Sequence, residues 1–224
     1  MYQWVTDKNL LKTTYSESAD VVNRLVQELK KYGIQSRMNV VGSKLRNMVT
    51  RDGKAPFDYD FNIWIENADR FDGGILKDTV KRAFDDVLSK KKWQHCKDST
   101  SVLTARKKQD SCYYIDVCIV KRDYFGHLHR LIHNKTGYVN MDQYYWNQFP
   151  ELEGLQEREE MLKPEHWEEV RKAYLDKKIM YQKRQDMYHK SFICYIEAVN
   201  EVYGKYFNRY NGYSLNGQAF IIRQ

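Results

Sequence analysis

Residues 39–66 read NVVGSKLRNMVTRDGKAPFDYDFNIWIE, and this stretch decides the fold. Its pattern predicts a strand that ends at Gly42-Ser43, a polar loop, and a second strand that carries Asp58 and Asp60. Side chains alternate faces along a strand, so both carboxylates point one way and the apolar residues between them point into a core. Because two carboxylates on one strand face repel each other, the pattern predicts a divalent metal ion between them.

A later strand supplies a third carboxylate. Residues 112–120, CYYIDVCIV, form an apolar run of the kind found inside sheets, and Asp116 is its only charged residue. Burying a carboxylate there is costly unless a metal or another cation neutralises it. We therefore expect Asp58, Asp60 and Asp116 to converge on one metal site.

Gly42-Ser43, the Asp58-Tyr59-Asp60 strand and the later Asp116, in this order, resemble the signature of the polymerase-β-type nucleotidyltransferases. The resemblance covers residues 20–145. The superfamily includes antibiotic nucleotidyltransferases, CCA-adding and poly(A) polymerases and cyclic-dinucleotide-type synthases, and this sequence looks most similar to small bacterial nucleotidyltransferase-like proteins of unassigned substrate. The loop between Ser43 and Asp58 is longer than in many members and contains a predicted turn at residues 51–54.

The resemblance implies an α+β fold in which helices flank a mixed β-sheet. It also implies an enzyme that transfers a nucleoside monophosphate from a nucleoside triphosphate such as ATP to a hydroxyl acceptor, with release of pyrophosphate. The three aspartates would be catalytic and would hold two Mg²⁺ or Mn²⁺ ions. The acceptor, which can be a small molecule, an RNA such as a tRNA, a protein or a second nucleotide, and the oligomeric state stay open.

Five further residues are candidates for nucleotide binding. Gly42 lets backbone N–H groups approach phosphate oxygens, and the Ser43 hydroxyl adds a donor. Lys44 and Arg46 follow directly and can meet a triphosphate electrostatically. In related enzymes the region of Tyr138 lies beside the nucleotide base, so the resemblance implies that Tyr138 is a candidate for stacking on the base. The alternatives are an ordinary strand-to-helix turn at Gly42-Ser43 and plain surface charges at the two cations.

Helical patterns flank the predicted strands. Thr14-x-x-Glu17 predicts a capping box that opens a helix ending at Gly33. After Phe149-Pro150 the composition shifts toward Glu, Lys, Gln and Met, with apolar residues at helical spacing. We expect a catalytic domain over residues 1–149 and a helical C-terminal subdomain over residues 150–224.

The composition of the chain indicates the kind of ligand it binds and the compartment it works in. The chain has 224 residues and a formal net charge of +7, and the basic excess lies in the part that holds the carboxylates, as suits polyanionic substrates. Its four cysteines form no C-x-x-C pair and no signal peptide is visible, which predicts reduced thiols in the cytoplasm. No apolar run approaches about 18 residues, so no membrane span is expected.

A hairpin is predicted around residues 134–137, between strands at 128–133 and 138–140. Three histidines in and next to its first strand are candidates for a second metal site. His127, His129 and His133 share one strand face, but no acidic or cysteine ligand is adjacent in sequence, which argues against zinc. Cys112 and Cys118 share the predicted face of Asp116. Because Mg²⁺ prefers oxygen ligands, both thiols are predicted to be packing residues.

Three other functions compete with nucleotidyl transfer. Some glycosyltransferases use an Asp-x-Asp motif to hold Mn²⁺ and a sugar nucleotide, although they need neither the upstream Gly-Ser nor the later Asp116. A nucleotide- or RNA-binding module can keep the fold as a sensor without catalysis. The aspartates can also be structural ion-pair partners of nearby Lys and Arg, in which case Asp58→Asn would destabilise the fold.

Overall fold

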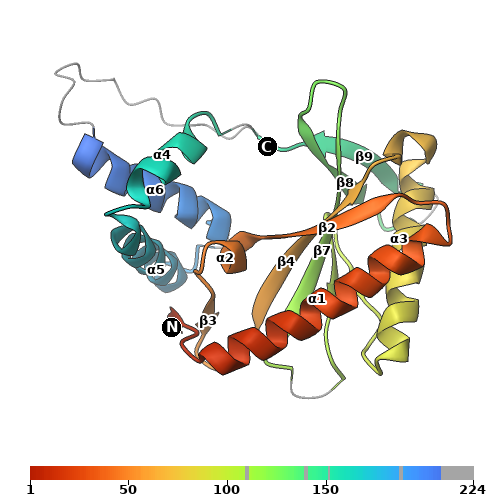
Figure 1. Ribbon diagram of the computed structural model, residues 1–224, viewed down its shortest axis with the longest axis horizontal. Helices are drawn as coiled ribbons and strands as arrows, with labels where there is room; N and C mark the ends of the chain where they lie inside the picture. The colour runs from red at the N-terminus through yellow and green to blue at the C-terminus, as the bar shows by residue number, and fades with distance from the viewer. Residues whose placement is uncertain (109–110, 139–140, 151, 187–188, 208–224) are drawn as a thin grey trace. The chain divides into compact units, whose positions relative to one another are not determined.

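In the computed structural model, which describes residues 1–108, 111–138, 141–150, 152–186 and 189–207, the strand with Asp58 and Asp60 is β4. The chain divides into two compact units, Met1–Glu151 and Leu152–Gln224 (Figure 1). The first contains β1 (Tyr2–Trp4), α1 (Lys8–Lys30), β2 (Ser36–Val41), α2 (Gly42–Leu45), β3 (Thr50–Asp52), β4 (Phe57–Ile65), the 3-10 helix η1 (Ala68–Arg70), α3 (Gly73–Lys90), β5 (Lys97–Asp98), β6 (Val102–Ala105), β7 (Tyr113–Arg122), β8 (Leu128–Asn134) and β9 (Gln143–Gln148). The second contains α4 (Leu155–Leu162), α5 (Trp167–Lys183) and α6 (Ser191–Phe207).

A mixed sheet forms the centre of the first unit. Its strands run in the order β2-β4-β7-β6-β5, while β8 pairs with β7 and β9 pairs with β8. Among the strands of the described residues, β4 and β7 are the one pair that runs parallel, and a parallel pair requires a crossover connection, which here contains α3. The predicted α+β class, a mixed sheet flanked by helices, is confirmed.

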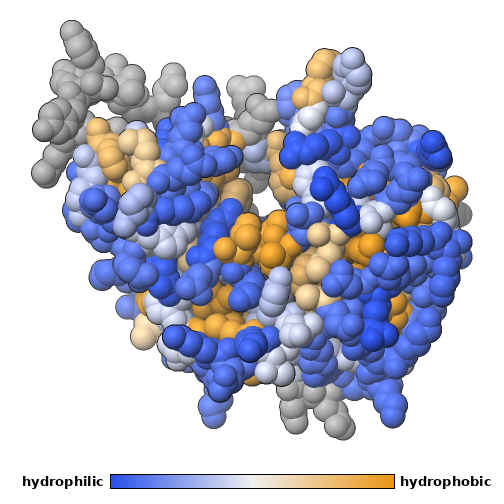
Figure 2. Space-filling view, in the orientation of Figure 1, coloured by the Kyte–Doolittle hydropathy of each residue, from blue (hydrophilic) through white to orange (hydrophobic). Residues whose placement is uncertain are grey.

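Helices α1 and α3 lie side by side and cover one face of this sheet (Figure 1). The alternation predicted for β4 is confirmed, because its odd-numbered residues are buried against these helices. The outward side of α3 is hydrophilic, as the blue surface at the right of Figure 2 shows. Fully buried side chains that meet in this core include Leu25, Leu29, Tyr59, Phe61, Ile63, Val80 and Phe84.

The start of α1 differs from the prediction. The helix begins at Lys8, and the Asp7 side chain caps it by accepting a 2.9 Å hydrogen bond from the Leu10 N–H. Thr14 lies inside the helix, where its hydroxyl is 2.9 Å from the buried Tyr59 hydroxyl. The predicted capping box at Thr14-x-x-Glu17 is therefore wrong: its threonine faces the core instead of a helix end.

The long loop between Ser43 and Asp58 contains a strand of its own. Residues 50–52 form β3, which pairs antiparallel with β1 at the start of the chain. The predicted turn follows directly, with a 2.8 Å hydrogen bond from the Ala55 N–H to the Asp52 carbonyl. The extra length of this loop thus builds a small second sheet with the N-terminal residues.

In the second unit, side-chain contacts join α5 to α6 near both ends of α5. Glu169, in the first turn of α5, accepts hydrogen bonds from Lys205 and Tyr206 in the last turn of α6. Near the end of α5, the Tyr181 hydroxyl donates to Glu197 over 2.9 Å. These contacts show that the two helices run antiparallel. None of the helices in the described parts of the chain is both long and apolar enough to cross a membrane.

Candidate metal and nucleotide site

The parallel pairing of β4 with β7 brings the three predicted carboxylates together. Asp60 is the register partner of Asp116, and Asp58 lies two residues earlier on the same face of β4. Asp58, Asp60 and Asp116 each offer an oxygen within 4.8 Å of the other two. This spacing suits a shared divalent cation, for which carboxylate oxygens are the preferred ligands.

These aspartates lie on the sheet face opposite the one that α1 and α3 cover, which we call the carboxylate face. Pairing and alternation place on it every second residue of four strands, β2, β4, β7 and β8. Its members include Arg37 and Asn39 on β2, Asp58, Asp60, Asn62 and Trp64 on β4, Asp116, Cys118, Val120 and Arg122 on β7, and Arg130 on β8.

Asp116 and Asp60 are partly buried, whereas Asp58 is exposed. The Thr104 hydroxyl, on the neighbouring strand β6, donates a 2.5 Å hydrogen bond to Asp116 Oδ1. Burial raises the pKa of Asp116, the Thr104 hydrogen bond opposes this change, and the Asp58 charge adds to it. No pattern in the sequence marks Thr104, because only the pairing of β6 with β7 places it beside Asp116.

Within the described residues, neither Asp58 nor Asp116 takes part in an ion pair with a lysine, arginine or histidine. The described part of the chain therefore offers no cationic partner for a structural ion-pair role of Asp58 or Asp116. A divalent cation is the group that would relieve their mutual repulsion.

Gly42 touches the site from the end of β2. Its φ is +66°, and a Cβ atom added to it would lie 2.1 Å from Asp60 Oδ2. Both facts require glycine, since other residues rarely adopt this backbone and a side chain would displace the carboxylate. The sequence pattern anticipated a close backbone approach at Gly42, and the structure shows that Asp60 is the group approached.

The residues after Gly42 form the short helix α2. The Met48 N–H donates to the Ser43 carbonyl over 2.8 Å, and Arg46 Nη1 donates to the Gly42 carbonyl over 3.2 Å. Lys44 Nζ lies 4.8 Å from the centroid of the Tyr15 ring. Lys44 and Arg46 are thus half-buried and held against the protein, Lys44 over Tyr15 of α1 and Arg46 against the backbone of the glycine turn.

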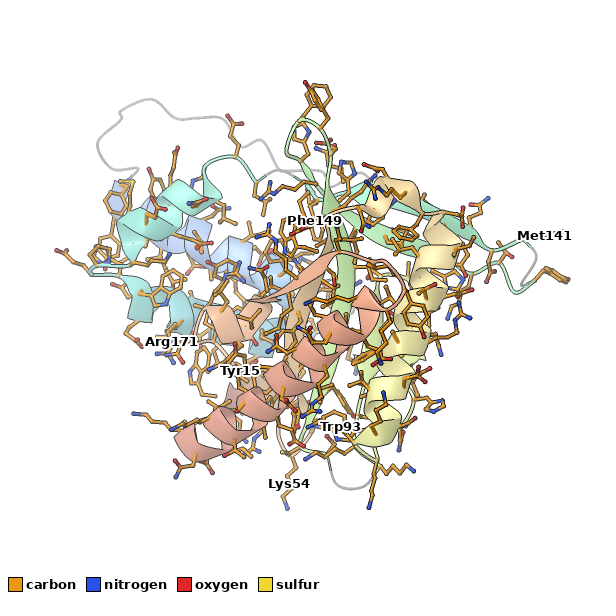
Figure 3. All side chains as sticks on the ribbon, turned by 45° about the vertical axis from the view of Figure 1, so that its right-hand side comes forward. Tyr15, Lys54, Trp93, Met141, Phe149 and Arg171 are labelled. Atoms are coloured by element: carbon orange, nitrogen blue, oxygen red, sulfur yellow. The ribbon has the colours of Figure 1, made fainter. Side chains whose placement is uncertain are left out.

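Tyr138 is not brought to this cluster. It lies in the connection between β8 and β9, is 72% exposed, and its carbonyl accepts a 2.8 Å hydrogen bond from the Met141 N–H. Figure 3 shows Met141 at the outer end of this connection, at the far right, whereas Tyr15 lies near the centre. Residues 139–140 of the predicted hairpin fall outside the described residues, and the second strand is Gln143–Gln148.

The three histidines considered for zinc do not gather. His133 lies between two carboxylates, with Nδ1 2.6 Å from Asp98 and Nε2 2.8 Å from Asp142. His127 and His129 instead approach Asp123, each at 3.1 Å. In the part of the chain that the structure describes, the aspartate triad is the one group of three or more side chains spaced to hold a metal ion.

Cys118 lies two residues beyond Asp116 on β7. Burial raises the pKa of its thiol to about 11, while the charge of Arg130 acts in the opposite direction. A protonated thiol is a poor metal ligand, so Cys118 fits the predicted packing role. Arg130 was missed in the sequence, where nothing marks it as a neighbour of the β7 face.

No family model and no curated protein matches the sequence, whereas solved structures match the fold. Vibrio cholerae DncV in its 3′-deoxy ATP-bound form superposes with a TM-score of 0.57 at 13% identity, over 83% of this chain and 50% of that one. The DncV cyclic AMP-GMP synthase with nonhydrolysable GTP gives 0.56 at 12% identity, over 76% and 46%. The CdnE cyclic dinucleotide synthase of Elizabethkingia meningoseptica, with GTP and Apcpp, gives 0.54 at 14% identity, over 81% and 68%.

The chain thus spans about half the length of the Vibrio cholerae structures. At these identities the likeness concerns the backbone arrangement. It agrees with the pattern of Gly42-Ser43 followed by carboxylates on two neighbouring strands, and the chain shares the fold of these solved structures, so the fold that the resemblance implies is confirmed.

Proposed function

We propose that this protein is a metal-dependent nucleotidyltransferase that transfers a nucleoside monophosphate from a nucleoside triphosphate to a hydroxyl acceptor. The observation that carries the proposal is the meeting of Asp58, Asp60 and Asp116 within 4.8 Å of one another, directly beside Gly42. Nucleotidyl transfer requires neutralisation of charge and close approach to phosphate oxygens. The metal site would supply the first and the glycine turn the second.

The three aspartates would hold two Mg²⁺ or Mn²⁺ ions. Such ions, when bound, stabilise negative charge on the attacking and leaving oxygens of an in-line displacement. Gly42 and Ser43 would position the triphosphate at the turn, and Lys44 and Arg46 would add positive charge there. Tyr138 stays a prediction for base stacking, although it lies outside the cluster.

The proposed transfer makes one bond and breaks one bond at the α-phosphorus. The acceptor hydroxyl oxygen forms a bond to the α-phosphorus, and the bond from that phosphorus to the bridging oxygen breaks, releasing pyrophosphate. The hydroxyl proton moves to Asp116, which lies at this site as a carboxylate able to accept it. Thr104 holds Oδ1 of Asp116, which leaves Oδ2 for this role.

We also propose a cytoplasmic setting and a two-domain organisation, with a catalytic domain at residues 1–149 and a helical subdomain at 150–224. All four cysteines are unpaired, as expected in a reducing compartment. The helical subdomain would help to choose the acceptor.

The test incubates the protein with each α-phosphate-labelled nucleoside triphosphate and Mg²⁺ or Mn²⁺, alone, with total RNA, and with a small-molecule extract. Label should move to a product with release of pyrophosphate. Asp58→Asn should abolish the transfer, whereas Asp86→Asn, an exposed aspartate on α3, should leave it unchanged.

The same assay separates the competing functions. Metal-dependent nucleotide binding without transfer, lost in Asp58→Asn, would favour the sensor. Transfer of sugar from a labelled sugar nucleotide would favour a glycosyltransferase. Absence of any nucleotide binding would rule out the proposal.

A further inference from the structure

Thr104 borders the aspartate triad from the strand on the other side of β7. Thr104, Asp116 and Asp60 are register partners in one row across β6, β7 and β4. Neighbouring strands lie roughly 4.8 Å apart, so the Asp116 side chain has Thr104 on one side and Asp60 on the other. Thr104 thus contacts the triad without being one of its carboxylates.

The hydrogen bond between Thr104 and Asp116 is short and directional. Thr104 Oγ1 donates to Asp116 Oδ1 over 2.5 Å, which is at the short end of the range for a hydroxyl that meets a charged oxygen. An ionised carboxylate only accepts hydrogen bonds, so the hydroxyl proton points at Oδ1. Within the described residues, no other side chain is hydrogen-bonded to Asp116. The orientation of this carboxylate therefore depends on Thr104.

The opposite face of β6 holds Thr104 in place. Leu103 and Ala105, the residues on either side of it, are fully buried in the core. Because side chains alternate along a strand, this burial directs Thr104 to the face of Asp116. Threonine also carries two heavy atoms on its Cβ, which restrict rotation about χ1. The hydroxyl donor is thus fixed before any metal ion binds.

Asp116 needs such an anchor because of its neighbours. Asp58, Asp60 and Asp116 each have an oxygen within 4.8 Å of the other two. Carboxylates at this spacing repel one another, which favours side-chain rotations that move Asp116 away. The hydrogen bond from Thr104 opposes such a rotation. In metal sites, the hydrogen-bond partners of ligating carboxylates fix the orientation of the ligand in the same way.

We propose that Thr104 is a positioning residue of the metal site: its hydroxyl keeps the Asp116 carboxylate in the orientation that an ion shared with Asp58 and Asp60 requires. This inference rests on the proposed metal-dependent transfer and adds a residue to its machinery. Thr104 acts through Asp116 and contacts neither the ion nor the nucleotide. Loss of its hydroxyl should weaken metal binding and slow the transfer.

The test measures Mn²⁺ binding in the full-length chain without nucleotide, from the electron paramagnetic resonance signal of free Mn²⁺. Thr104→Val replaces the hydroxyl by a methyl group and should weaken Mn²⁺ binding about 10- to 100-fold, the usual effect of losing a partner of a metal ligand. Thr104→Ser keeps the hydroxyl and should restore most of the affinity. Unchanged Mn²⁺ affinity in Thr104→Val, or a loss as large in Thr104→Ser, would overturn the inference.

Thr79→Val is the matched control for deleting a threonine hydroxyl inside the protein. Thr79 lies on α3, which covers the opposite face of the sheet (Figure 1), and its hydroxyl donates to the Ile75 carbonyl over 2.7 Å. Chemical denaturation in chelator checks that both valine variants are folded under the binding conditions. Thr79→Val should bind Mn²⁺ like the unmutated protein. An equal loss of affinity in both variants would show a general structural effect and overturn the positioning role.

Transfer kinetics separate this inference from the proposed function. At saturating Mn²⁺, Thr104→Val should lower kcat and leave the KM for the nucleoside triphosphate unchanged, because Thr104 does not contact the nucleotide. Weakened Mn²⁺ binding in Thr104→Val, with no transfer by the unmutated protein, would support the positioning role and contradict the proposed transfer. Normal Mn²⁺ binding and normal transfer in Thr104→Val would overturn the positioning role alone.

Discussion

Gly42 is the residue at which backbone conformation and site chemistry coincide. We predict that Gly42→Ala lowers both stability and nucleotide-dependent activity, because the new methyl group would meet the Asp60 carboxylate in a left-handed backbone. The conformational cost alone is about 1–2 kcal/mol. Denaturant unfolding and the transfer assay would measure the two effects.

Gly33→Ala supplies the matched control. Gly33 has a similar φ of +70°, but a Cβ there would meet nothing within 4 Å. It should therefore show the backbone cost with activity intact. Equal loss of activity in both variants would argue against a special role for the contact between Gly42 and Asp60.

Asp116 provides a pH-dependent prediction. Burial raises its pKa above the ordinary value of 3.8, so its charged form destabilises the metal-free fold. Asp116→Asn should raise the free energy of unfolding of metal-free protein at neutral pH. The gain should appear as pH rises above 3.8 and vanish below it, where the aspartate is already neutral.

The measurement is chemical denaturation of both proteins in chelator across this pH range. A stabilisation that is equally large at acidic pH would show that charge burial is not its cause. Destabilisation at neutral pH would instead support a structural role of the carboxylate through its hydrogen bond with Thr104.

At the scale of elements, the first helix owes its start to Asp7. Asp7→Ala should cost about 1 kcal/mol, the usual effect of losing a side-chain cap, because the Leu10 N–H would lose its acceptor. Lys8→Ala, at the exposed next position, should change stability little. Urea midpoints at unchanged slope would test this, and a silent Asp7→Ala would contradict the capping assignment.

The elements also show where sequence patterns succeed. The buried face of β4 was predictable, because strict alternation of apolar and polar residues indicates a half-buried strand. The helix start was not, because Thr14-x-x-Glu17 satisfies a cap and a buried helical face equally well. Contact with Tyr59, 45 residues away, decides between them.

At the scale of the whole molecule, metal binding should be visible as stability. Ligands that bind only the folded state stabilise it by mass action. Mg²⁺ or Mn²⁺ should raise the melting temperature of the unmutated protein, and chelator should reverse the rise. Asp58→Asn should lose the response, whereas a response kept in this variant would place the ion elsewhere.

The sequence by itself determined the strand that ends at Gly42-Ser43, the two strands that carry the three carboxylates, a helix before Gly33 and the helices after Pro150, because these depend on local periodicity and on the cost of burying charge. Only the tertiary structure decided which residues become neighbours. The contact of Gly42 with Asp60 and the positions of Thr104 and Arg130 relative to Asp116 follow from strand pairing across separate segments. Strand register is set by packing of the entire sheet against α1 and α3, which no local pattern encodes.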